Sequence, residues 1–151
     1  MKKALFLIAA ASAFGLASPT LLAHTAEVLD TQKAPNGGQQ RMAGIYHYEL
    51  IVAKDSKEAR DNAVVVYVTD HAGTKLPTAG ASGTATILAG KAKATATLAP
   101  DGDNRLKGVA KYLSAPDMKV VVSITFPGKA AEQARFTPLA AAKDGHADHK
   151  H

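Results

Sequence analysis

The sequence contains no cysteine and no tryptophan, and aromatic residues make up only 5% of it. A chain without cysteine forms no disulfide and offers no thiolate ligand, thiol nucleophile or redox pair. The few aromatic side chains leave little material for an exposed platform on which carbohydrate stacks. Any bound metal must therefore be held by histidine, methionine, carboxylates or the backbone.

Familiar enzyme motifs are absent as well. No serine lies in a Gly-x-Ser-x-Gly pattern, and no pair of carboxylates is marked by an apolar pocket. The formal net charge is +5, but lysines such as Lys91 and Lys107 are spread along the chain. Such spacing is typical of a solvated face. We therefore expect a protein that is not an enzyme and has no nucleic-acid partner.

Residues 1–23 have the character of a secretory signal peptide. Lys2 and Lys3 form a positive n-region, residues 4–17 form a nearly unbroken apolar run, and Ala23 ends a small-residue cleavage site. This run is short for a membrane span, and no second long apolar run follows it. We expect cleavage after Ala23 and a periplasmic protein without a membrane span.

The body of the chain shows a period of two that is typical of strands. Residues 24–40 are polar and contain Asn36-Gly37-Gly38, which predicts a flexible leader with a turn. Residues 46–53 then alternate between the two faces of a strand, and residues 62–70 are rich in β-branched side chains. Turn signals separate these segments from later ones, with a hairpin expected around Ala89-Gly90.

This pattern predicts an all-β fold. Its about seven short strands, at roughly 8–12-residue spacing, favour an antiparallel immunoglobulin-like β-sandwich over residues 41–138, flanked by flexible termini. The Cys…Trp…Cys core of true immunoglobulin domains is missing from it. Residues 139–151 are expected to form a disordered tail.

Four segments carry a resemblance to known proteins. They read APNGGQQRMAGIYHYELIV, VYVTDHAGTKLPTAGASGTATIL, TLAPDGDNRLKG and APDMKVVVSITFPGKAAEQARF, and together they span residues 34–136. Their order resembles small exported proteins of bacterial heavy-metal resistance systems. It is also similar to the β-domain of some periplasmic adaptor subunits of metal-efflux pumps. The resemblance implies a periplasmic role with copper or related ions, and an efflux adaptor as a partner, without assigning ligands.

The C-terminal tail gathers half of the histidines of the chain. Three of the six histidines lie within the final segment GHADHKH, beside two aspartates. Neutral imidazole suits Cu(II), Ni(II), Co(II) and Zn(II), and a flexible tail can bend several rings around one ion. The tail is therefore a candidate metal site, with a solvated polar end as the alternative. Its candidate ligands are His146, His149 and His151.

His24 becomes the first residue if cleavage follows Ala23. It then offers an α-amino nitrogen and an imidazole to one ion, as in copper enzymes that begin with histidine. No Asp-x-His pair follows late in the chain, so a copper oxidase of this kind is only a minor hypothesis. We expect His24 to serve as an additional loose ligand.

The remaining candidates lie in the body. His47 is expected on the outward face of the first strand, near its middle, and His71 in the turn after the second strand. Both are interpreted as surface histidines, and joint ligation by this pair is not expected. Thioethers favour Cu(I), so Met42, His47 and Met118 form a further candidate group, with core packing as the alternative for the methionines.

The leading hypothesis is a periplasmic metal-binding accessory protein. It would be a carrier or docking module for copper, with zinc, nickel and cobalt left open, and would serve an efflux system. The alternative is an exported protein-interaction module of the same fold that acts without metal. The copper oxidase is the third hypothesis.

Overall fold

The computed structural model describes residues 25–141. The predicted signal peptide, His24 and the histidines of the tail lie outside this range. Within residues 25–141, no helix has the length and apolar character needed to cross a membrane. The elements are α1 (Ala26–Thr31), β1 (Gln39–Ala43), β2 (Tyr46–Val52), β3 (Arg60–Asp70), β4 (Ser82–Ala89), β5 (Ala92–Pro100), β6 (Arg105–Tyr112), β7 (Lys119–Thr125) and β8 (Glu132–Phe136).

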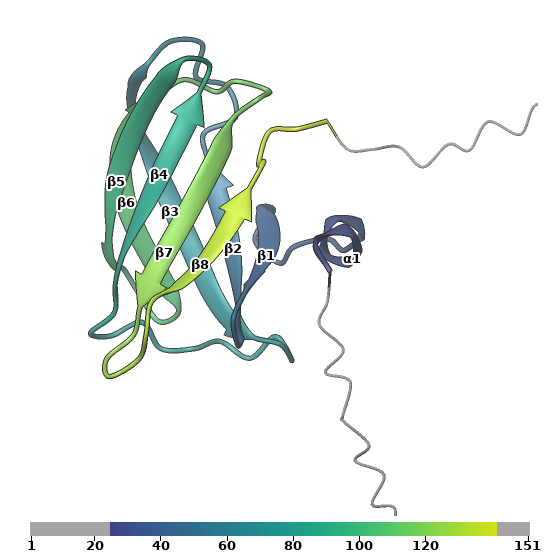
Figure 1. Ribbon diagram of the computed structural model, residues 1–151, viewed down its shortest axis with the longest axis vertical. Helices are drawn as coiled ribbons and strands as arrows, with labels where there is room; N and C mark the ends of the chain where they lie inside the picture. The colour runs from purple at the N-terminus through teal and green to yellow at the C-terminus, as the bar shows by residue number, and fades with distance from the viewer. Residues whose placement is uncertain (1–24, 142–151) are drawn as a thin grey trace, which may run out of the picture.

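The eight strands form one antiparallel sheet in the order β1-β2-β3-β6-β5-β4-β7-β8. Figure 1 shows this sheet curving until its two end strands, β1 and β8, lie near each other. The all-β antiparallel prediction is confirmed. The finer prediction of an immunoglobulin-like sandwich is not confirmed, because the strands follow one continuous, nearly closed, barrel-like course.

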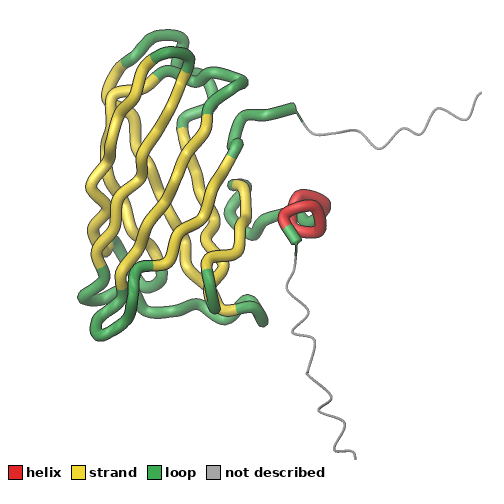
Figure 2. Tube along the Cα trace, in the orientation of Figure 1, coloured by secondary structure: helices red, strands yellow, loops and turns green. Residues whose placement is uncertain are grey.

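Strands and turns account for nearly all of the described chain, as Figure 2 shows. The alternation read from residues 46–53 gives the core face of β2, and the expected hairpin between β4 and β5 turns at Gly90, where φ is 59°. Hydrophobic side chains fill the interior. The largest fully buried ones include Tyr48, Leu50, Val64, Val66, Val68, Ile87, Leu98, Leu106, Met118, Val120, Ile124 and Phe136.

Side chains bridge the seam where the first and last strands meet. The Tyr48 hydroxyl donates a hydrogen bond to the backbone oxygen of Glu132 at 3.2 Å, and burial raises the pKa of this tyrosine. The backbone N–H of Thr137 donates to Oε1 of Gln39 at 2.8 Å. The first contact joins β2 to β8, and the second joins β1 to the residue that follows β8, while no ladder of backbone hydrogen bonds connects β1 and β8 within residues 25–141.

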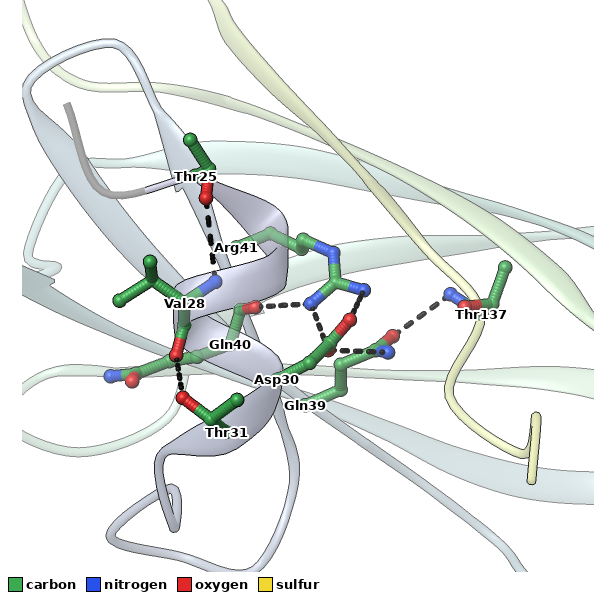
Figure 3. Close-up of polar contacts among 8 residues, drawn as sticks. All are labelled: Thr25, Val28, Asp30, Thr31, Gln39, Gln40, Arg41 and Thr137. Atoms are coloured by element: carbon green, nitrogen blue, oxygen red, sulfur yellow. Dashed lines mark hydrogen bonds and ion pairs between the residues drawn. The ribbon is translucent and has the colours of Figure 1, made fainter. Parts of the chain in front are cut away.

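Part of the segment predicted as a leader, residues 24–40, has regular secondary structure. Thr25 caps α1, the Leu29 side chain is only 3% exposed, and β1 already begins at Gln39. Asp30 on this helix accepts two hydrogen bonds from the guanidinium of Arg41 in β1, at 2.7 and 3.2 Å (Figure 3). The helix is therefore fixed to the first strand by one apolar and one ionic contact.

The buried carboxylate of Glu49 fixes the rest of the leader. Its Oε1 accepts hydrogen bonds from the backbone N–H groups of Asn36 and Gly38, at 2.8 and 2.9 Å, and its Oε2 accepts one from Nδ2 of Asn36 at 2.9 Å. Glu49 lies on the face of β2 opposite to Tyr48 and is only 3% exposed. The leader thus covers the face of β2 that points away from the barrel core.

Candidate metal site

Two potential metal ligands face each other across the first hairpin. β1 and β2 are joined by a two-residue turn that begins at Gly44, whose φ of 58° suits the first central position of a tight hairpin. Ala43 pairs with Tyr46 beside the turn, and Met42 pairs with His47 next along the strands. Directly opposed residues lie on one face, with Cβ atoms about 4.5–5.5 Å apart.

A third potential ligand lies just beyond the end of β3. His47 pairs with Thr69 in this neighbouring strand, and His71 follows two residues later, on the same side of the chain. The imidazole rings of His47 and His71 are stacked, with centroids 4.7 Å apart and planes inclined by 24°. The structure therefore brings together two histidines that were not expected to act jointly.

The turn that carries His71 is held by its neighbour. Oδ1 of Asp70 accepts hydrogen bonds from the backbone N–H groups of Ala72 and Thr74, at 2.9 and 2.8 Å. These bonds lower the pKa of the Asp70 carboxyl below its usual range, and the bond from the Thr74 backbone has the largest effect. The Asp70 side chain thus fixes the backbone of the turn that carries His71.

The expectation that His47 is a surface residue near the middle of its strand is wrong. His47 is the second residue of β2 and only 6% exposed, whereas His71 is exposed. Alternation correctly places His47 opposite to Tyr46 and Tyr48, but it does not reveal whether that face is covered. The His71 ring lies against His47, and the leader covers the same face further along at Glu49, so the face that the sequence suggested would meet water is largely shielded.

A buried hydroxyl lies on the other side of His47. Thr69, its register partner in β3, has an Oγ1 atom that is shielded from solvent and has no hydrogen-bond partner within residues 25–141. A buried hydroxyl without a partner costs about 1–3 kcal/mol, so it marks a position where an ion with its water, or a further polar group, is favoured. Thr69 thus adds a buried hydroxyl to the strand beside His47.

Met118 does not join Met42 and His47. The Met118 side chain is fully buried in the core. Ser114 comes shortly before Met118 in the chain, and its hydroxyl donates to the backbone oxygen of Ala53 at 2.7 Å. Ala53 comes directly after β2, so Met118 belongs to the end of the barrel opposite to His47. At roughly 3.3 Å per residue, this separates the two by about 16 Å or more. Core packing is thus the role of Met118.

His71 is the candidate ligand that sequence reasoning missed. Two consecutive antiparallel strands place the start of the first beside the end of the second. His47 stands at the start of β2 and His71 just beyond the end of β3, so their proximity follows once the two strands are paired. The signal was present in the sequence, but it depended on the register.

The described part of the chain holds no group of three or more His, Cys, Asp or Glu side chains that could bind a metal. The candidate site consists instead of two imidazoles and one thioether. Comparisons with protein-family models, curated proteins and solved structures found no match to this chain. Four predicted ligands lie outside the described residues and stay predictions: His24, His146, His149 and His151.

Proposed function

We propose that the protein is an exported, non-enzymatic metal-binding accessory protein, a carrier or docking module for copper or a similar ion. The observation that carries this proposal is the stacked pair of His47 and His71, whose ring centroids are 4.7 Å apart. Neutral imidazole is the commonest protein ligand of copper and related ions. Because His71 is exposed and its ring lies against that of His47, an ion that reaches His71 from solvent also comes close to His47.

The barrel has a clear part in this function. Its sheet fixes the backbone of His47 on two sides, through the pairs with Met42 and Thr69. A fixed first ligand lowers the ordering cost that a wholly flexible site would bear on binding. The signal-like N-terminus and the resemblance to metal-resistance proteins support a periplasmic location and an efflux adaptor as the partner. We retain the immunoglobulin-like β-sandwich as a hypothesis for the fold class of this protein.

Calorimetric titration of the exported protein with Cu(II), Zn(II), Ni(II) and Ag(I) tests the proposal. His71→Asn removes the exposed ligand, and Lys93→Asn, at an exposed position of β5, is the control. A third protein carries asparagine at all three tail histidines. We expect His71→Asn to lose binding and the other two proteins to retain a site. If only the tail variant loses metal binding, the tail histidines hold the metal instead of His47 and His71. If none of the proteins gives heat on titration, the proposal is overturned.

A surface hollow favours the alternative, a metal-independent interaction module. This open hollow of about 300 Å³ extends over β7 and β8, and its lining includes Leu88, Val121, Lys119 and Arg135. Leu88 is 46% exposed and adds apolar surface to this hollow beside the two cationic side chains. If no metal binds, this cationic and apolar surface is the first place to look for a protein partner.

A further inference from the structure

We infer that Met42 is the third ligand of this site and that the site selects a soft monovalent cation, copper(I) or its analogue silver(I), over zinc(II). The inference rests on the proposed function, because it requires His47 and His71 to bind metal. It goes further by naming the ligand set and the class of ion. The three residues come from three separate pieces of the fold: β1, β2 and the turn after β3.

The position of Met42 follows from the register of the hairpin. Residues that flank a two-residue turn form a hydrogen-bonded pair, here Ala43 with Tyr46. The next pair is not hydrogen-bonded, and in such pairs the opposed side chains approach most closely. Met42 and His47 form this next pair, so a thioether and an imidazole share one face.

The chemistry of these ligands distinguishes between ions. Thioether sulfur is a soft ligand that suits copper(I), whereas zinc(II) in proteins prefers four thiolate, imidazole or carboxylate ligands in a tetrahedron. Within residues 25–141 the site offers two imidazoles and one thioether, and no triad of His, Asp and Glu supplements them. Met42, His47 and His71 therefore satisfy a three-coordinate soft cation better than they satisfy zinc.

The strand that carries Met42 is held in place before any ion arrives. Its preceding residue, Arg41, forms the ion pair with Asp30 of α1, and Gln39 contacts Thr137 beyond β8 (Figure 3). Met42 is half-buried and His71 is exposed, so an ion can approach from solvent between these two side chains. The step is ligand binding alone, and it requires no change in the oxidation state of the ion.

The test compares two methionine-to-leucine variants of the exported protein in which the tail histidines are asparagine. Met42→Leu removes the proposed ligand, and Met118→Leu makes the same change in the core at the far end of the barrel. Silver(I) and zinc(II) affinities are measured by calorimetry, and copper(I) affinity by anaerobic competition with a coloured chelator. The ε-methyl NMR signals of the methionines report directly on sulfur coordination.

We expect Met42→Leu to weaken silver(I) and copper(I) binding by at least about tenfold, the loss that even an outer-shell partner causes. Zinc(II) binding changes by less than twofold, roughly, since zinc does not depend on the thioether. The Met118→Leu protein matches its parent, and only the Met42 methyl signal shifts when silver(I) is added.

Other outcomes separate this inference from the proposed function. If Met42→Leu leaves silver(I) affinity unchanged while His71→Asn weakens it, the thioether is not a ligand and the histidine site stands. If zinc(II) binds the parent as tightly as silver(I), the selectivity is wrong. If no variant, including the parent, binds any of the three ions, both proposals fail together.

Discussion

Replacing Glu49 is expected to release the leader from the barrel. The carboxylate accepts three hydrogen bonds, two from backbone N–H groups of Asn36 and Gly38 and one from the Asn36 side chain, while it is 3% exposed. Hydrogen bonds to a charged group contribute about 1.5–3 kcal/mol each, so their sum sets an upper limit of about 9 kcal/mol. The cost of burying the carboxylate offsets part of that sum.

Water also reaches the exposed Asn36 once Glu49 is gone, which reduces the loss further. We therefore expect Glu49→Ala to lower the free energy of unfolding by about 2–4 kcal/mol. Glu49→Gln retains one oxygen for the two backbone donors but loses the charge, and should cost about half as much. Glu58→Ala, at an exposed position, is the matched control and should change stability by less than about 0.5 kcal/mol.

Urea unfolding followed by far-ultraviolet circular dichroism measures these differences. Hydrogen exchange of the Gly38 amide distinguishes release of the leader from loss of the whole fold, since Gly38 donates directly to the carboxylate. Fast exchange at this amide in the Glu49→Ala protein is the expected result. The reasoning is refuted if the Glu49 and Glu58 variants are equally stable and the amide is equally protected in both.

The remaining predictions concern the first turn and the far end of the barrel. Gly44→Ala places a Cβ at a φ of 58° and 2.6 Å from the Glu132 carboxyl, and should lower the free energy of unfolding by about 1–2 kcal/mol in denaturant melts. Gly128→Ala has open space around its Cβ, so it measures the effect of the positive φ alone. Equal losses of stability in the two variants would show that the Glu132 contact contributes nothing. Tyr112→Phe leaves the backbone N–H of Ala53 without its acceptor at 3.0 Å and should cost about 1–3 kcal/mol. Burial raises the pKa of Tyr112 in the folded protein, so above about pH 10 the unfolded chain loses this proton first. The contribution of Tyr112 to stability is therefore constant below about pH 10 and falls above it. The same loss of stability above about pH 10 in Tyr112→Phe would contradict this.

Strand positions could be predicted from the sequence because a period of two needs only local information. The alternation in residues 46–53 gave the core face of β2 correctly, and glycine marked the turn at Gly90. The curvature that brings β1 beside β8 could not be read this way. It depends on pairing between strands that are remote in sequence, and no local pattern encodes it.

The leader and the site show the same limit. The six-residue helix α1 is too short to be stable alone, and it is held by the burial of Leu29 and the ion pair of Asp30 with Arg41. The burial of His47 likewise depends on the segments that cover its face. Residue chemistry identified Met42 and His47 as candidates, but only the register of β2 and β3 adds His71.

The seam between β1 and β8 has a consequence for how the protein matures. Gln39 and Thr137, which form a hydrogen bond there, are 98 positions apart, so the curved sheet is complete only when the last strand is in place. Bringing such distant partners together costs loop entropy and comes late in folding. A chain that lacks β8 and Thr137 cannot finish this structure, because these residues supply one side of the seam. Completion only after the last strand is available is thus built into the strand order itself.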